Sequence, residues 1–341
     1  QWLFYQELSI LYQAFSQGKP SPLPTLPIQY LDFAHWQRQW LTGDILNQQR
    51  NYWQLQLAGL HTGLELPTDH SRPAVQQFRG AIFYSSLSPT LTARLKQLSQ
   101  QTGTTLFMTL LSACATLFYR YSGQTDIVIG SPVPTRTPAQ LQSLVGFLVN
   151  VLIFRLNLEG NPRFEELLRQ ARRVALAAYA HQDIPFQQVI ETLQPNRKNT
   201  SQSPLLQVML EVHNRPVAQL DLPELNSEFS VPEDSTAVYN LSLAMVETTE
   251  GLTVTLEYNT DLFEPATIER LFGHLQTLLE GIVANPQQRI HELPLLTEAE
   301  QQQLRAWNDT AVEYPFDQCI HQLFEEQAGK TPEAIAVVFE N

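Results

Sequence analysis

Apolar residues recur at three- and four-residue steps along several stretches of this chain, which is the spacing of one face of an α-helix. We therefore expect helices at residues 2–15, 89–102, 104–121, 162–179, 185–193 and 265–283. Other stretches have the shorter alternating or continuous apolar pattern of strands, at residues 126–133, 147–156, 205–212, 238–247 and 252–258. Because these helices and strands interleave without strict βαβ alternation, the pattern predicts an α+β fold with a mixed sheet.

Two of the expected helices carry clear local signals. Ser88 followed by Pro89 is typical of a helix start, and Gly103 is typical of a helix end. The next stretch, 104–121, is apolar on nearly every side, which predicts a buried helix. Cys114 lies within it, so we expect this thiol to pack rather than to react.

The ends of the chain and its proline-rich stretches indicate how it is organised. The sequence opens on Gln1 inside an apolar helical period, with no cap, basic region or cleavage site, so we expect a piece cut from a longer polypeptide. The prolines of residues 17–29 predict an extended connector. Residues 284–315 also carry prolines and few strand signals, which suggests a linker before a short helix and strand at 317–339.

Composition and charge exclude several classes of protein. The chain of 341 residues has a formal net charge of -13, which disfavours a nucleic-acid partner. No apolar run is long enough to span a membrane, so no membrane partner is expected. Cys114 and Cys319 have no ligand-type spacing, which predicts no metal site and no disulfide framework and fits a cytoplasmic protein.

Common catalytic templates do not occur in the sequence. There is no GxSxG, HExxH, GxGxxG or phosphate-binding glycine loop, and the histidines are scattered rather than paired. A free-standing acyltransferase that uses His35 or His181 as its base remains open, because such a base needs an orienting partner that sequence alone does not reveal.

Four short segments stand out from this background. Residues 30–37 read YLDFAHWQ, residues 145–150 read VGFLVN and are followed by Arg155, and residues 181–186 read HQDIPF. The fourth segment, residues 198–205, reads KNTSQSPL.

Together these segments resemble, in the same order, sequence blocks of the condensation domains of non-ribosomal peptide synthetases. The family patterns are YxD[YF]AxWQ, VGxFxNTxxxR, [HN]QDxPF and RDxSRxPL. Val151 stands where the family has Thr, and Gln202 stands where it has its second Arg.

The resemblance implies a chloramphenicol-acetyltransferase-like condensation-domain fold, with part of the first lobe and a complete second lobe. Residues 1–75 would end the first lobe and residues 76–295 would form the second. Residues 296–315 would be a linker, and residues 316–341 the start of an adenylation domain.

The resemblance also implies a site, although no catalytic residue. The family's HHxxxDG motif would lie before Gln1, and the chain contains no adjacent histidine pair, so the fragment is expected to be inactive by itself. We predict substrate binding by Asn150, His181, Gln182 and Asp183.

Structural roles for the same residues stay open. Asp183 could instead cap the helix at 185–193. Asn150 and Arg155 lie five positions apart on a strand and should face opposite sides of the sheet. We expect Tyr30 and Trp36 to pack. The arginines of the helix at 162–179 form either a solvated face or a docking patch for an acidic carrier: Arg163, Arg169, Arg172 and Arg173.

The implied activity of the parent is amide-bond formation between a carrier-bound acyl or peptidyl thioester and a carrier-bound aminoacyl acceptor. The implied partners are upstream and downstream carrier domains and an adjacent adenylation domain. No cofactor would bind directly, because the substrates would arrive on 4′-phosphopantetheine arms. The alternative is a non-catalytic module that docks carriers or supports a neighbouring domain.

Overall fold

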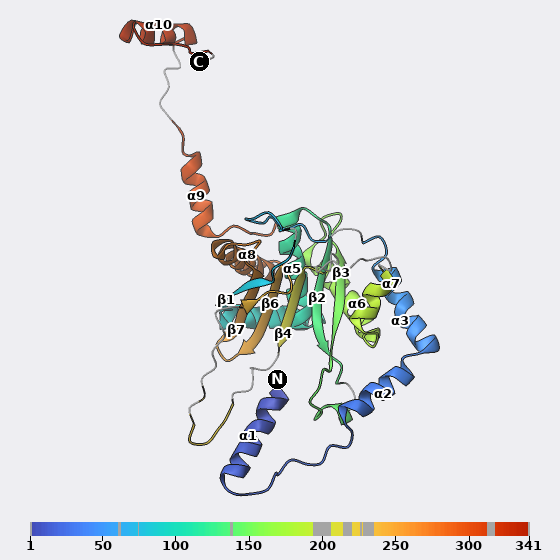
Figure 1. Cartoon of the computed structure of the whole chain (residues 1–341). Helices are drawn as coiled ribbons and strands as arrows, with labels where there is room; N and C mark the ends of the chain where they lie inside the picture. The colour runs from blue at the N-terminus through green and yellow to red at the C-terminus, as the bar shows by residue number, and fades with distance from the viewer. Residues whose placement is uncertain are drawn as a thin grey trace. The chain divides into compact units, whose positions relative to one another are not determined.

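The structure is a computed structural model that describes residues 2–60, 63–73, 75–136, 139–193, 206–213, 220–225, 227, 235–311 and 318–339. It divides into two compact units, Gln1–Leu296 and Thr297–Asn341. The elements are labelled in Figure 1.

The first unit is built on one mixed sheet of seven strands in the described residues, in the order β3-β2-β4-β6-β7-β1-β5. The strands are β1 (Arg79–Leu87), β2 (Asp126–Pro134), β3 (Val149–Asn157), β4 (Val208–His213), β5 (Ser235–Thr236), β6 (Leu241–Thr248) and β7 (Gly251–Asn259). β2 pairs parallel to β4 and β4 pairs parallel to β6, whereas the other pairings are antiparallel. The predicted α+β fold with a mixed sheet is therefore confirmed.

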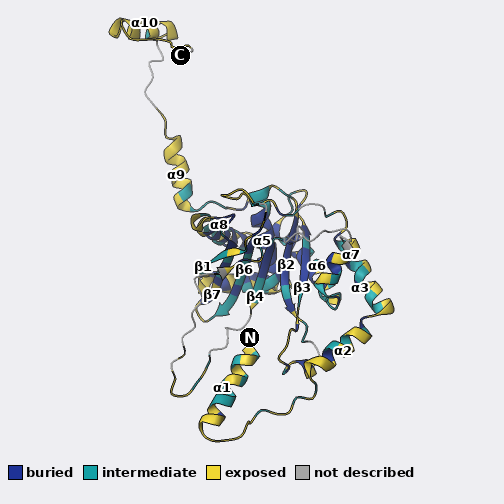
Figure 2. Ribbon diagram, viewed as in Figure 1, coloured by how far each residue is buried: buried dark blue, intermediate teal, exposed yellow. Residues whose placement is uncertain are grey.

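Helices cover one face of this sheet. The helices of the first unit are α1 (Trp2–Ser16), α2 (Tyr30–Trp40), α3 (Gly43–Gln56), α4 (Pro89–Gln101), α5 (Leu106–Ser122), α6 (Phe164–Ala180), α7 (Phe186–Leu193) and α8 (Pro265–Ala284). Along β6, alternate residues from Leu241 to Met245 are buried and their neighbours are half-buried. α5 and α6 pack near β2 and β3, and α4 and α8 pack near β7 and β1. The dark-blue core in Figure 2 therefore lies between helices and sheet.

Local sequence signals explain how the central helices begin and end. The Ser88 Oγ accepts the Leu91 N–H at 3.2 Å and caps α4, as predicted. Gly123 ends α5 with a φ of 72°, a left-handed conformation that favours glycine. Cys114 in α5 is fully buried, and burial raises the pKa of its thiol to about 12, so it packs as expected.

The pattern missed several elements. It did not predict α2, α3 or β1, although β1 forms the full antiparallel ladder with β7 that closes one side of the sheet. The side chains of β1 are mostly half-buried, because it lies next to the edge strand, so the apolar alternation that marks a strand is weak.

Two further expectations at the C-terminal end are wrong. The segment 285–295 is no linker, because Ile290 and Leu293 are buried in the core of the first unit. In the second unit, α9 (Glu298–Asn308) and α10 (Ile320–Lys330) are helices, but residues 335–339 form no strand. A strand needs a partner for its ladder, and the described residues supply none there.

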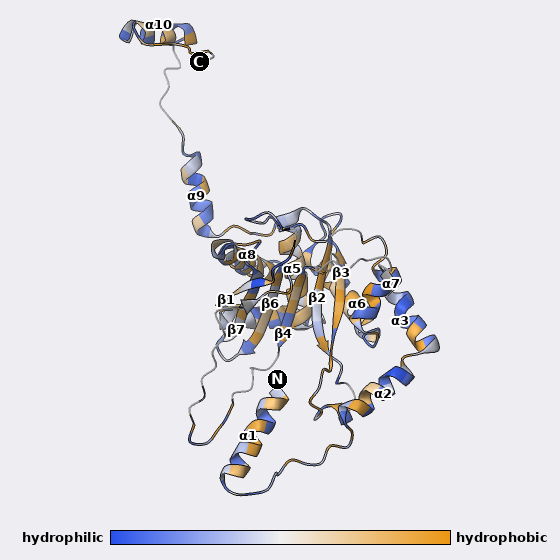
Figure 3. Cartoon of the chain, viewed as in Figure 1, coloured by the Kyte–Doolittle hydropathy of each residue, from blue (hydrophilic) through white to orange (hydrophobic). Residues whose placement is uncertain are grey.

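The apolar stripe of α1 does not lie against the core. Ala14 is its buried residue, whereas Trp2, Phe4 and Phe15 are about half exposed. Figure 3 shows hydrophobic and hydrophilic positions alternating along this helix. The hydrogen bond from the Asp221 N–H to the Ser9 Oγ, at 3.1 Å, ties α1 to another described segment.

Among the described residues, no individual helix has both the length and the apolar character needed to cross a membrane; α4 and α5 meet those criteria only as a pair bent by 105°.

Candidate functional site

The first sequence block, residues 30–37, forms α2 and packs on the second block. Phe33 is buried with Leu144 and Leu148, just before β3. The Tyr30 hydroxyl donates to the Phe147 carbonyl at 3.3 Å, and its ring lies so close to Gly146 that a β-carbon there would clash. Tyr30 is thus a packing residue, as predicted.

The remaining polar residues of α2 also have local roles. The Asp32 Oδ2 accepts the Gln29 N–H at 2.8 Å, which caps the helix. Trp36 is 46% exposed and stacks on Trp40, with ring centroids 5.1 Å apart. His35 contacts Gln39 at 2.9 Å on the exposed side of α2 and has no orienting carboxylate among the described residues, which gives no support to its use as a base.

Asn150 joins the second block to the third. Its Nδ2 donates to the carbonyls of Gln182 and Ile184, each at 2.8 Å. Its Oδ1 accepts the N–H groups of Val151 and Phe186, each at 2.9 Å. A carboxamide has two donors and two acceptor lone pairs, so these bonds use its whole capacity. The structure therefore gives Asn150 a positioning role: it fixes residues 182–186 against β3.

His181 is held at the end of α6. Its Nδ1 lies 2.8 Å from the Ala177 carbonyl, and its ring stacks on Tyr52 of α3 at a centroid distance of 4.0 Å and an angle of 7°. The His181 carbonyl accepts the indole N–H of Trp53 at 2.9 Å. A neutral His181 that donates from Nδ1 would keep the lone pair of Nε2, which has no partner among the described residues.

Asp183 does not cap α7, so the capping interpretation is wrong. The oxygen that accepts the Phe186 N–H at the start of α7 belongs to Asn150. Asp183 Oδ2 instead accepts from Gln49 Nε2 of α3 at 3.3 Å. Burial raises the pKa of the Asp183 carboxyl, and the charge of nearby His181 partly offsets this rise.

Arg155 lies on the other face of β3 from Asn150, as the odd spacing predicted. Its guanidinium forms a two-pronged pair with Asp126, with a shortest distance of 2.8 Å. This contact raises the pKa of Arg155. Nη1 also donates to the carbonyls of Gln56 and Ala58, so Arg155 ties the end of α3 to the sheet.

The α3 side chains at this junction were not predicted. Gln49 and Trp53 are buried, and together with Tyr52 they contact His181 and Asp183. No spacing in the sequence indicates them, because their partners lie about 130 positions away.

The open face of the sheet carries a second unpredicted group. Glu211 on β4 and Glu257 on β7 lie near each other across β6. Burial, and then the charge of Glu211, raise the pKa of Glu257. Glu211 also lies 3.1 Å from His213, whose pKa it raises.

The arginines of α6 divide between contacts and solvent. Arg169 pairs with Glu165 at 3.1 Å, and Arg163 reaches the Gln287 carbonyl at 3.4 Å. Arg172 and Arg173 are exposed. The described residues contain no cluster of metal-ligating side chains. The fourth block, residues 198–205, lies outside the described residues.

Three of the four blocks therefore form one continuous assembly of α2, β3 and the 181–186 turn. Comparison with known families agrees with this order: the Condensation domain model matches residues 2–305, and the chain belongs to the condensation-domain family. The predicted condensation-domain fold is confirmed.

Particular relatives are large synthetases. The chain is 46% identical to a linear gramicidin synthase of Brevibacillus parabrevis, over 98% of the chain but 4% of that protein. It is 43% identical to malpinin synthetase of Mortierella alpina, again over 98% of the chain and 4% of that protein. The chain is thus similar to a small part of each synthetase.

Solved structures show the same fold. A complex of the X-domain and OxyB from teicoplanin biosynthesis matches with a TM-score of 0.78 and 27% identity, over 87% of this chain and 66% of that chain. A four-domain non-ribosomal peptide synthetase, holo-AB3403 bound to AMP and glycine, matches with a TM-score of 0.76 and 23% identity, over 97% of this chain and 26% of that one.

Proposed function

We propose that this chain is part of a condensation domain whose parent synthetase forms an amide bond between two carrier-bound substrates. The acceptor amine attacks the carbonyl carbon of the donor thioester; the C–N bond forms, the C–S bond breaks, and the amine proton is lost as the donor thiol is released. The observation that carries this proposal is the assembly of three family blocks through Asn150, in a chain that resembles a synthetase over 98% of its length.

The residues of this chain would contribute positioning rather than proton transfer. Holding two tethered substrates in register can lower a barrier by several kcal/mol, on the order of 7–11 kcal/mol in well-oriented model reactions. Asn150 would fix the 182–186 turn, and α3 would hold His181 and Asp183 in place. Direct substrate contacts by His181, Gln182 and Asp183 remain a prediction.

The proton-handling group would come from the HHxxxDG motif of the family, which this sequence does not contain. We therefore propose that the 341-residue chain alone makes no amide. The lobe boundary at residue 75, the linker at 296–315 and the adenylation start at 316–341 are part of the same proposal, as are carrier domains with phosphopantetheine arms as partners and a cytoplasmic location.

The test is a two-carrier assay with the parent synthetase. A donor carrier and an acceptor carrier are loaded separately, and the dipeptidyl thioester on the acceptor is measured by mass spectrometry. We expect product with the parent and none with the 341-residue chain. Correctly loaded carriers that yield no product with the parent would contradict the proposal.

The Asn150→Ala variant of the parent sharpens this assay. We expect slower product formation with unchanged carrier loading, because the 182–186 turn loses its anchor. The matched control is Asn157→Ala at the exposed end of the same strand, which is expected to retain the parental rate.

A non-catalytic docking module is the second candidate. The X-domain that this chain resembles is described in a complex with OxyB, which favours a role in protein binding. Binding of loaded carriers by the parent without any product, under conditions where a control synthetase condenses them, would support this alternative.

A further inference from the structure

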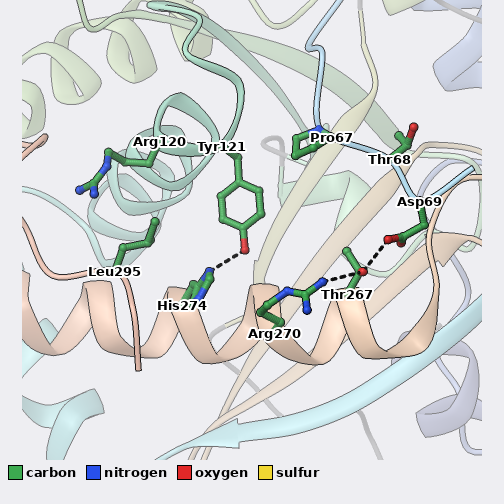
Figure 4. A pocket seen from close by; sticks show the side chains of 9 residues that line it. All are labelled: Pro67, Thr68, Asp69, Arg120, Tyr121, Thr267, Arg270, His274 and Leu295. Carbon is green, nitrogen blue, oxygen red and sulfur yellow. Dashed lines mark hydrogen bonds between the residues drawn. The ribbon is translucent and has the colours of Figure 1, made fainter. Parts of the chain in front are cut away.

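A cavity of about 380 Å³ lies beneath residues 67–69 and is unrelated to the blocks described above. Figure 4 shows it between the end of α5, which supplies Arg120 and Tyr121, and the helix α8, which supplies Thr267, Arg270 and His274. Pro67 and Leu295 add apolar surface. The cavity thus joins three segments that are far apart in the sequence.

The segment over the cavity is anchored to α8. The N–H of Asp69 donates to the Leu262 carbonyl at 2.9 Å. Both carboxylate oxygens of Asp69 are engaged: Oδ2 accepts the Glu264 N–H at 2.8 Å and Oδ1 accepts the Thr267 hydroxyl at 2.9 Å. The negative charge of Asp69 is therefore committed to the start of α8.

The floor of the cavity is a polar pair. The hydroxyl of Tyr121 lies 2.6 Å from Nδ1 of His274, which is 6% exposed. The pair fixes both rings, so the floor is rigid and already formed.

Two arginines stand on either side of this pair (Figure 4). Arg120 donates to the Leu293 carbonyl at 2.9 Å, and Arg270 donates to the Thr267 hydroxyl at 3.0 Å. Neither forms an ion pair with a carboxylate in the part of the chain that the structure describes. Burial lowers the pKa of Arg120, which reflects the cost of holding its charge away from water.

The charges around the cavity therefore sum to a local excess of positive charge in a chain whose net charge is -13. Guanidinium groups bind carboxylate and phosphate oxygens with paired, charge-assisted hydrogen bonds. An anion placed between Arg120 and Arg270 would offset this positive charge, and the Tyr121–His274 pair would offer polar contacts below it.

We propose that this cavity binds a small oxyanion, a phosphate or a carboxylate, between Arg120 and Arg270. Pro67 and Leu295 would contact the apolar part of an organic ligand. This inference is independent of amide-bond formation.

The test measures saturable binding of inorganic phosphate and of succinate to the 341-residue chain by calorimetry, against chloride at equal ionic strength. We expect at least one of the two to bind. Binding of phosphate alone indicates a phosphorylated ligand, and binding of succinate alone indicates a carboxylate. No saturable binding of either anion would overturn the proposal.

Variants distinguish the cavity from general charge attraction. Arg270 is exposed, so Arg270→Gln should keep the fold, yet it is expected to weaken binding at least about tenfold, the loss typical of one charge-assisted contact. Asp69→Asn removes a negative charge and is expected to strengthen binding. Arg172→Gln, which changes an exposed arginine of α6, is the matched control and should leave binding unchanged. Equal effects of Arg270→Gln and Arg172→Gln would show adventitious ion binding and overturn the proposal.

Discussion

The N–H of Phe186 donates to the Oδ1 of Asn150 at 2.9 Å, so a residue of β3 caps a helix that begins 36 positions later in the chain. The same side chain donates to two carbonyls of the intervening turn. Since one carboxamide satisfies all these groups, the turn that carries His181 and Asp183 is fixed relative to the sheet by a single residue.

Asn150→Ala is expected to destabilise the chain by about 2–3 kcal/mol, because it leaves partly buried N–H and carbonyl groups without partners. Urea unfolding followed by circular dichroism measures this change. Asn157→Ala, which removes one hydrogen bond at the exposed end of β3, should cost well under half as much. Equal losses for the two variants would refute the anchoring role of Asn150.

Gly146→Ala is expected to displace α2, because the added methyl group would collide with the ring of Tyr30. Overpacking of this kind costs about 1–3 kcal/mol. Hydrogen exchange of the α2 amides should accelerate in the variant while exchange in α5 stays unchanged.

A double variant checks the cause. Tyr30→Ala together with Gly146→Ala should cost less than the sum of the single changes, since the colliding ring is absent. Strict additivity would mean that the Gly146 effect comes from the backbone and not from Tyr30.

The parts of the fold that could be predicted are those with strong local signals. The helix α5 is apolar all round and α4 has a Ser-Pro start, and both are found within a few residues of the expected ends. In contrast, α3 has few buried residues, and its contacts are with partners distant in sequence. Its position depends on tertiary packing that no short pattern encodes.

The site shows the same division. The blocks at 145–150 and 181–186 are recognisable by their letters, yet the cap of α7 was assigned to Asp183, the nearest acidic residue in sequence. The structure gives that role to Asn150, because β3 passes close to the start of α7. Sequence proximity favours local caps, whereas the fold can bring an acceptor from another element.

Asp69→Ala is expected to destabilise the chain by about 1 kcal/mol at neutral pH, the usual cost of a lost helix cap. The hydrogen bond from the Glu264 N–H is the main cause that lowers the pKa of Asp69 below its ordinary value of 3.8. A folded-state pKa below the unfolded one adds stability that is present above pH 3.8 and lost as pH falls through the folded value.

Urea unfolding at neutral pH and at a pH well below 3.8 separates this contribution. The difference between the wild-type chain and Asp69→Ala should shrink at the lower pH. Asp221→Ala, which changes an exposed carboxylate, is the control and should show a small difference at both. A difference that is independent of pH would mean that Asp69 acts without its charge.

Tyr52→Phe is expected to leave stability at neutral pH unchanged or slightly higher. The Tyr52 hydroxyl is buried and has no hydrogen-bond partner among the described residues, so its removal costs no contact, while the ring can still stack on His181. Burial raises the pKa of Tyr52 from 10.0 to about 12.

At alkaline pH the two proteins should diverge. Because the folded-state pKa lies above the unfolded one, the wild type loses stability as pH rises from 10.0 towards about 12, whereas the Phe variant lacks this loss. The expected difference is roughly 1 kcal/mol, since the exposed part of the ring is screened by solvent.

Urea unfolding at neutral pH and at a pH between 10.0 and about 12 measures this difference. Other buried tyrosines, such as Tyr179, titrate in both proteins and cancel. Tyr84→Phe, whose ring is 56% exposed, should follow the wild type at both pH values. If Tyr52→Phe follows it as well, the Tyr52 hydroxyl is solvated, and the tight stack on His181 is not maintained in solution.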